Sequence, residues 1–285
     1  MEHLEAGVMT TLKVEREASF GYFLSNGHED VLLHHHEILK NLHIGESIDV
    51  FLYQDKLGRL AATMRKPTIM KGIYGWVEVV DVKEDLGVFI HIGTSKDILI
   101  HKNDLPKMKH VWPTIGGKLY CTLKTDKQGR LLGKIATEKE MESLFIKASR
   151  SEFNKNISGI VYRTLRSGSF IITNEGYRGF IHESQREEEP RLGSNVQGRI
   201  IDVKNDGSIN VSLLKRSHEA IIDDANKILS YLNNRGGVMP LTDHSLPEEI
   251  QNKFGMSKGA FKRAIGYLMK QGKVYQNDGW TYLKR

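Results

Sequence analysis

The sequence predicts a multidomain, mainly β protein, with three small five-stranded barrels in tandem followed by an α+β domain. Two observations support this fold class. A pair of strands, the first with an aromatic ring and the second ending in histidine, recurs three times within the 285 residues. After Ser217, the two-residue period of strands gives way to the spacing of amphipathic helices.

The clearest strand pair runs from Leu86 to His101 and reads LGVFIHIGTSKDILIH. At a period of two, one face of the pair carries only aliphatic side chains, namely Val88, Ile90, Ile92, Ile98 and Ile100. The opposite face carries Phe89 and His91 on the first strand and Leu99 and His101 on the second. We therefore expect one face to fill a barrel and the other to present rings to a ligand.

The same strand pair occurs upstream in Ser19 to His34 and downstream in Ser167 to His182. Each unit then closes with two strands around a tight turn, within Leu52 to Leu60, Leu123 to Leu131 and Ile201 to Ile209. Repeats of roughly 65 to 80 residues are too long for solenoid units and fit small, separately closed domains. We assign the three units to residues 1–65, 66–137 and 154–216.

In order, the first unit offers strands at Gly7 to Val14, Phe20 to Ser25, Val31 to His34, Ser47 to Tyr53 and Arg59 to Met64, with a helical insertion at Glu37 to Leu42. This arrangement is typical of an OB-fold barrel. The second unit opens at Gly75 to Val82 and has its insertion at Asn103 to Met108. The third has a charged insertion at Gln185 to Pro190.

Residues 138–153 are predicted to form a connecting helix that packs between barrels. Its apolar side chains fall at helical spacing: Met141, Leu144, Phe145 and Ala148. Thr137 followed by Glu140 resembles a capping box.

Residues 217–285 are predicted to form three helices and a hairpin, which is a winged-helix arrangement. An apolar stripe marks the first helix, at Ile221, Ile222, Ala225, Ile228, Leu229 and Leu232. Pro247 to Phe254 forms the second helix, and Ser257 caps the third. The inward face of the third helix is expected to hold Phe261, Ala264, Ile265, Leu268 and Met269. Asn277-Asp278-Gly279 is the turn of the hairpin.

The composition narrows the class of protein. A net charge of +6 is compatible with a polyanionic partner. The sequence has no apolar run of bilayer length and no leader pattern, so we expect a cytoplasmic protein without membrane contact. Its single cysteine, Cys121, excludes an internal disulfide framework and is expected in the core.

Each β unit resembles the S-one domain, the OB-fold RNA-binding module named after the first protein of the small ribosomal subunit. The resemblance implies a binding face of two aromatics, a histidine, and an Asp and Arg around the last turn. The first unit has all five, as Phe20, Phe23, His34, Asp55 and Arg59. The second unit has four, Phe89, His101, Asp126 and Arg130, with Leu86 at the first aromatic position.

The third unit keeps Phe170 and His182 but has Ser167, Lys204 and Ser208 at the other positions. Other rings and cations lie close to the same strands, namely Tyr162, Arg163, Arg166, Tyr177, Arg178 and Phe180. If this unit binds RNA, its face must be built differently, and the sequence leaves that question open.

The residues themselves favour single-stranded RNA as the partner, with no cofactor. Each unpaired base that stacks on an aromatic ring contributes about 1–3 kcal/mol, and arginine binds phosphate or stacks on the base plane. The alternatives are weaker. The run His34-His35-His36 has no nearby Cys or carboxylate at metal-ligand spacing. Asp55 and Asp126 each lie in a Gly-Arg turn without a second acid, which favours a structural role over catalysis.

In the winged-helix domain, Lys258, Lys262 and Tyr267 of the third helix are the candidate contacts. This helix can bind duplex nucleic acid or dock on a barrel or partner, and the sequence does not choose between these roles.

Three S-one-like units followed by a winged helix resemble the bacterial conserved virulence factor B family. That resemblance implies an RNA-binding regulator of gene expression that affects virulence factors in Gram-positive bacteria. The alternative is a DNA-binding transcription regulator in which the winged helix reads duplex and the barrels bind proteins. A nuclease is disfavoured, because no acidic metal cluster or histidine pair stands at useful spacing, so we expect a protein that is not an enzyme.

Overall fold

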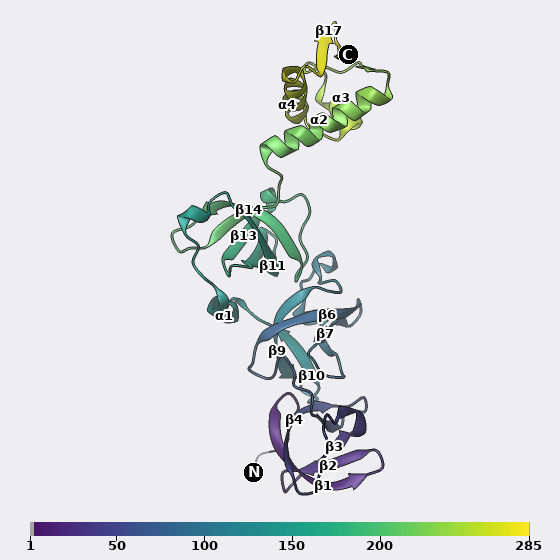
Figure 1. The fold of residues 1–285 in the computed structure, drawn as a ribbon, viewed down its shortest axis with the longest axis vertical. Coiled ribbons are helices and arrows are strands. Elements are labelled where there is room, and N and C mark those ends of the chain that lie inside the picture. Colours follow the sequence, from purple (N-terminus) through teal and green to yellow (C-terminus); the bar gives the residue numbers. More distant parts are fainter. Residues whose placement is uncertain (1–2, 285) are drawn as a thin grey trace. The chain divides into compact units, whose positions relative to one another are not determined.

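The computed structural model describes residues 3–284 and confirms a mainly β protein with a helical C-terminal region (Figure 1). The backbone contacts divide the chain into two compact units, residues 1–213 and 214–285. The first unit contains the three β domains, and the second contains the winged helix.

The first barrel is a closed sheet in the strand order β1-β2-β3-β5-β4. Its strands are β1 Met9–Ala18, β2 Gly21–Ser25, β3 Asp30–His34, β4 Ser47–Gln54 and β5 Leu60–Thr63. A 3-10 helix, His35–Glu37, follows β3. Alternate side chains of these strands, including Leu24, Leu33 and Val50, fill the interior and are fully buried.

The second unit has strands β6 Gly75–Lys83, β7 Gly87–His91, β8 Ile98–His101, β9 Lys118–Thr125 and β10 Leu131–Ile135. They form a five-stranded sheet in the order β10-β9-β6-β7-β8, whose end strands lie close together. Gly133 permits this approach, because a Cβ there would lie 2.7 Å from Ile100 Cγ1 and 2.9 Å from Ile90 Cδ1. The insertion after β8 consists of two 3-10 helices, Lys102–Asp104 and Lys109–Val111.

The third barrel repeats the closed order as β11-β12-β13-β15-β14. Its strands are β11 Asn156–Leu165, β12 Gly168–Thr173, β13 Arg178–His182, β14 Asn195–Val203 and β15 Ile209–Ser212, with a 3-10 helix at Glu183–Gln185. The first strand of every β unit carries a bulge at the same place, between Val14 and Arg16, Val79 and Asp81, and Val161 and Arg163. The three units are therefore structural repeats.

The segment 138–153 is not one continuous helix, which corrects that prediction. The α-helix α1 covers Glu138–Met141, and 3-10 helices follow at Glu142–Leu144 and Arg150–Glu152. The helix stops because the backbone pairs with the third barrel: Ile146 N donates to Gly176 O at 2.8 Å and Ala148 N to Gly207 O at 2.9 Å.

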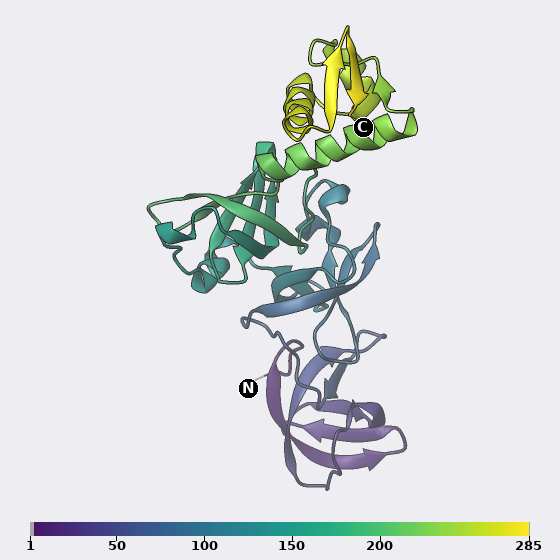
Figure 2. The same cartoon turned by 45° about the horizontal axis from the view of Figure 1, so that its top comes forward.

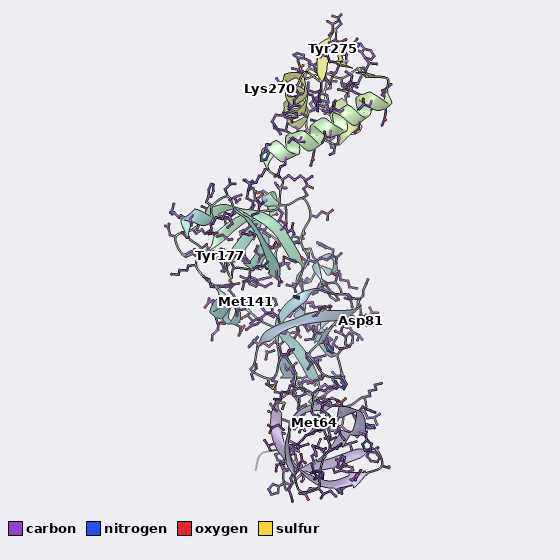
Figure 3. All side chains as sticks on the ribbon, in the orientation of Figure 1. Met64, Asp81, Met141, Tyr177, Lys270 and Tyr275 are labelled. Atoms are coloured by element: carbon purple, nitrogen blue, oxygen red, sulfur yellow. The ribbon has the colours of Figure 1, made fainter. Side chains whose placement is uncertain are left out.

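Packing between the second and third barrels is confirmed for the start of this segment. Met141, labelled in Figure 3, is buried in a cluster that joins Trp76 and Tyr120 of the second barrel to Tyr162 and Ile172 of the third. At the N-terminal end of α1, the Thr137 N–H donates to Glu140 Oε2 at 2.7 Å, as the capping pattern predicts.

The first two barrels share a hydrophobic core. Phe51 and Ala6 of the first barrel are buried in the same cluster as Ile69 and Leu123 of the second unit. Backbone hydrogen bonds continue the junction, because Lys71 N donates to Gly7 O at 2.9 Å. The two barrels therefore pack directly on each other.

The C-terminal unit has helices α2 Ser217–Asn234, α3 Pro247–Phe254 and α4 Lys258–Lys270, and strands β16 Val238–Met239, β17 Val274–Asn277 and β18 Trp280–Leu283. The strands form a sheet in the order β16-β18-β17, and its hairpin is drawn in yellow in Figure 2. The predicted cap of α4 is confirmed, since Ser257 Oγ accepts from Ala260 N at 3.2 Å. Ile222 and Met269, expected inside, are 40% and 45% exposed.

Cys121 is fully buried in the second barrel, and burial raises the pKa of its thiol. This agrees with its predicted place in the core. Across residues 3–284, no helix combines the length and the apolar character that crossing a membrane requires.

Candidate nucleic-acid interface

A glycine of the second strand pairs with the histidine that ends the third strand in all three β units. The pairs are Gly21 with His34, Gly87 with His101 and Gly168 with His182. At each glycine φ is positive, and a Cβ would lie 2.0 to 2.3 Å from a carbonyl oxygen of the third strand. These positions therefore require glycine.

The aromatic residue two positions after each of these glycines lies on the same sheet face as the histidine. These residues are Phe23, Phe89 and Phe170, and all three side chains are half-buried. A backbone constraint thus sets a ring and an imidazole side by side on one partly exposed face, once in each unit.

The face of the first barrel has two aromatic rings. Phe20 is 45% exposed, and its ring centroid lies 6.2 Å from that of Phe23 in an edge-to-face arrangement. Arg16 pairs with Phe23 across the strands, and its Cζ lies 3.6 Å from the centroid of that ring. This cation–π contact adds a guanidinium to the predicted face.

His34 closes the same face and stacks on His36, with ring centroids 3.7 Å apart. Its Nδ1 is buried without a hydrogen-bond partner among the residues described. Desolvation, with the neighbouring His36 and His35, lowers the pKa of His34. This shift favours the neutral form of the ring, which suits stacking on a base.

Asp55 and Arg59 form a salt bridge across the β4–β5 turn, with Arg59 Nε donating to Asp55 Oδ2 at 2.8 Å. Asp126 and Arg130 repeat it across the β9–β10 turn at 2.7 Å. In both turns the backbone N–H of the arginine also donates to the aspartate, to its Oδ1 at 2.9 Å. Each aspartate therefore shapes the turn and holds its arginine, as its predicted structural role requires.

In the second unit, Phe89, Leu99 and His101 share the outer face, and His101 Nδ1 accepts from Asn103 N at 3.2 Å. Leu86, at the position of the missing aromatic, is 49% exposed. His91 is exposed beside Asp97, whose Oδ1 lies 3.0 Å from its Nδ1.

The third barrel face is built from two phenylalanines and two arginines. Phe170 and Phe180 pair across β12 and β13 with ring centroids 4.9 Å apart. Arg178 lies over Phe170 with its Cζ 4.6 Å from the centroid, and Arg163 lies at 5.8 Å. His182 is exposed at the end of the same face, 6.3 Å from Phe180.

The connecting segment contributes an acidic residue, Glu138, to this third face. Its carboxylate accepts hydrogen bonds from Arg178 Nε at 2.6 Å, Tyr162 OH at 3.0 Å and Arg163 Nη1 at 3.4 Å. Burial, together with the charge of Glu138, raises the pKa of Tyr162, so its hydroxyl remains a donor. The cations of this face are therefore already paired within the chain.

Two predicted residues of the third unit lie elsewhere. Tyr177, labelled in Figure 3, packs against the barrel interior, at the end where Ile146 pairs with it. Arg166 is exposed in the turn before β12. The structure thus assembles Arg163, Phe170, Arg178, Phe180 and His182 but not Tyr177.

The sequence reasoning missed Arg16 and Glu138. Arg16 stands seven residues before Phe23, as Arg163 does before Phe170, and this shared spacing was a usable signal. Glu138 is distant in sequence from its partners on β11 and β13, so no local pattern indicated it.

In the winged-helix unit, Lys262 and Arg263 are exposed on α4. Lys258 Nζ donates to His244 O at 3.3 Å, and Tyr267 packs against the core of the unit. Of the three predicted contacts, Lys262 is therefore the most available to a ligand. On the hairpin, Tyr275 is 47% exposed and stacks on Tyr282, with ring centroids 5.1 Å apart.

Family models match most of the chain. Residues 6–65 match the S1 domain, and residues 74–134 match the CvfB first S1-like domain. Residues 141–215 match the second domain of the virulence regulatory factor CvfB, and residues 226–283 match the CvfB-like winged helix domain.

Full-length relatives show the same similarity. Conserved virulence factor B of Staphylococcus epidermidis is 41% identical over 264 residues, 89% of this chain and 88% of the relative. The uncharacterized protein YitL of Bacillus subtilis is 50% identical over 284 residues, 100% of this chain and 95% of its own. A crystal structure of a multidomain protein with nucleic acid binding domains from Streptococcus pneumoniae is 36% identical, with a TM-score of 0.66 and 98% of each chain covered.

Proposed function

Because the chain belongs to the conserved virulence factor B family, we propose that it is a cytoplasmic RNA-binding regulator of gene expression, virulence factors included. It binds single-stranded RNA through the outer faces of its β domains and catalyses no reaction. One observation carries this proposal. The same face, a half-buried phenylalanine beside a histidine, is built three times by the same Gly–His register.

Such a face suits unpaired bases. Aromatic rings offer stacking surfaces that accept any base, and the nearby arginines Arg59 and Arg130 can bind phosphate. Three modest platforms on one chain raise affinity through effective concentration if they can follow one strand. The choice of RNA is supported by the resemblance of the units to S1 domains.

The test is binding of a labelled single-stranded RNA to the full chain, measured by fluorescence anisotropy at several salt concentrations. Wild type is compared with a four-fold variant, Phe23→Ala and His34→Ala with Phe89→Ala and His101→Ala. The matched control carries Phe153→Ala and His43→Ala, an exposed ring and an exposed imidazole outside these faces. We expect the four-fold variant to lose at least about tenfold in affinity and the control to lose little. Unchanged binding of the four-fold variant would contradict the proposal.

A second candidate function is duplex DNA binding by the winged helix. The observation that favours it is the exposed pair Lys262 and Arg263 on α4, the helix that such domains use for recognition. Competition between duplex DNA and single-stranded RNA of equal length separates the two candidates. A clear preference for duplex, lost on Lys262→Ala with Arg263→Ala, would favour DNA.

The proposed absence of catalysis has its own test. Labelled RNA incubated with the protein and magnesium should remain intact on a denaturing gel. Turnover of the RNA that exceeds a no-protein control would overturn this part of the proposal.

A further inference from the structure

A groove lies between the first and second barrels, with walls from both. Its volume is about 410 Å³. We call it the interbarrel groove. The first barrel contributes Tyr53, Gln54, Asp55, Lys56 and Gly58 to its lining. The second contributes Leu86, Phe89, Lys96, Leu99, His101, Arg130 and Leu132. The β4–β5 turn of the first barrel therefore borders the proposed RNA face of the second.

Specific hydrogen bonds hold this turn in place. Lys96, between β7 and β8, donates from Nζ to Gln54 O at 2.6 Å and to Asp55 O at 3.3 Å. Leu131 N donates to Gln54 Oε1 at 3.2 Å. Desolvation lowers the pKa of Lys96, which fits an ammonium group enclosed by the junction. Lys96 is thus a positioning residue, because its ammonium group donates hydrogen bonds to the backbone of the β4–β5 turn.

The chemistry of the lining defines the ligand. The apolar side chains Phe89, Leu86 and Leu99 offer a surface for a flat ring. Lys56 and Arg130 supply cations, and the carboxylates Asp55 and Asp97 also line the groove. Tyr53 of the first barrel adds an aromatic ring to this groove, beside a second unit that has Leu86 at its own first aromatic position. A volume of this size falls in the usual range of small-ligand sites, about 300–1,000 Å³.

We infer that the interbarrel groove holds one nucleotide of single-stranded RNA, with its base on Phe89 and its phosphate between Arg130 and Lys56. This inference rests on the proposed function and adds that the second site is composite: the first barrel supplies one wall. The two barrels then bind RNA as one element.

The matched test uses equivalent turn residues. Lys56 and Lys127 occupy the same position in the β4–β5 and β9–β10 turns, and both are exposed, but only Lys56 belongs to the interbarrel groove. Anisotropy with a labelled single-stranded RNA is measured for Lys56→Glu, Lys127→Glu, Phe89→Ala and the combination of Lys56→Glu with Phe89→Ala. Thermal melting of each variant checks that it is folded.

We expect Lys56→Glu to weaken binding about tenfold and Lys127→Glu clearly less. If Lys56 and Phe89 touch the same nucleotide, the combined variant loses less than the product of the two single losses. Two results together would overturn the composite groove: equal losses of affinity for the two lysine variants, and a loss in the combined variant that equals the product of the single losses. RNA binding by the faces would remain supported. No effect of Phe89→Ala would likewise overturn the groove, because the inferred base lies on that ring. Failure of wild type to bind RNA would overturn the proposed function itself.

Salt dependence separates positioning from phosphate contact. Loss of one phosphate contact lowers the slope of log affinity against log salt by about 0.7 for a single strand. We expect Arg130→Gln to show this reduction, and Lys96→Met to weaken binding with an unchanged slope. A reduced slope for Lys96→Met would contradict its assignment to the turn. Displacement of the RNA by uridine monophosphate at equal affinity would assign the groove to a free nucleotide and overturn the RNA assignment.

Discussion

The carboxylate of Glu138 accepts a hydrogen bond from Arg178 Nε at 2.6 Å, on the face of the third barrel where an RNA phosphate would bind. Arg178 in turn lies over the ring of Phe170. An acid that pairs with the arginine of a proposed RNA site competes with phosphate for that arginine.

Replacement of Glu138 by Gln should therefore strengthen RNA binding. The variant keeps a hydrogen-bond acceptor but removes the competing charge, so we expect a few-fold gain in affinity and a steeper salt dependence. The cost in folding free energy should be at most about 1 kcal/mol, because both side chains are partly exposed. Anisotropy and urea denaturation measure the two effects. Glu142→Gln, an exposed acid of the same segment, is the control, and an equal gain there would point to net charge alone.

Leu86→Phe should improve the second site. It restores a ring at an exposed position that lines the interbarrel groove, and a stacked base contributes about 1–3 kcal/mol. We expect several-fold tighter binding of single-stranded RNA by anisotropy, with unchanged binding of duplex. Ile115→Phe, at an exposed position of the same unit outside the groove, should leave the affinity unchanged. If both variants gain equally, added surface hydrophobicity is the cause.

Asp126 should contribute stability that depends on pH. The hydrogen bond from the Arg130 side chain, with N–H donors from Arg130 and Gln128, lowers the pKa of Asp126 below its usual 3.8. The unfolded chain thus holds the proton more tightly, so the stabilisation is complete above the usual pKa and is lost as pH falls through the folded pKa. Asp126→Asn should lower the urea midpoint at pH 7, and its difference from wild type should shrink as pH falls below 3.8. If the difference in urea midpoint between Asp126→Asn and wild type stays constant with pH, this linkage is ruled out. Asp85→Asn, at an exposed position, is the control.

Gly133→Ala should destabilise the second β domain by about 1–3 kcal/mol, because its Cβ would overlap Ile100 and Ile90. Gly266→Ala gives the opposite expectation. It lies within α4, its Cβ would meet no atom within 4 Å, and alanine favours the helix by about 0.5–1 kcal/mol. Thermal or urea unfolding of the two variants checks whether stability falls in Gly133→Ala and rises in Gly266→Ala. A neutral Gly133→Ala would show that β8 and β10 can separate without cost.

The β units and the winged helix could be predicted because their signals are local. Alternation of apolar and polar residues indicates the strands, and the spacing of Phe261, Ala264, Ile265 and Leu268 indicates a buried helix face. The single helix over 138–153 could not be corrected from sequence. Its spacing is helical, but the main chain at Ile146 and Ala148 bonds instead to residues of the third barrel.

In the candidate site, too, some features follow from local sequence patterns and others depend on tertiary contacts. The phenylalanine and histidine of each face follow from strand period and register. The role of Glu138 depends on where α1 places it against β13, and the role of Lys96 depends on a turn about forty residues earlier in the chain. Tertiary contacts of this kind leave no local pattern.

The burial of Phe51 in a core common to two barrels decides how this part of the protein can be divided. A fragment that ends at residue 65 would leave the ring of Phe51 facing water, and a fragment that begins there would lack part of its own interior. Denaturant should melt the two barrels in a single cooperative transition. Truncations that aim to assign RNA binding to one barrel should therefore keep residues 1–137 together.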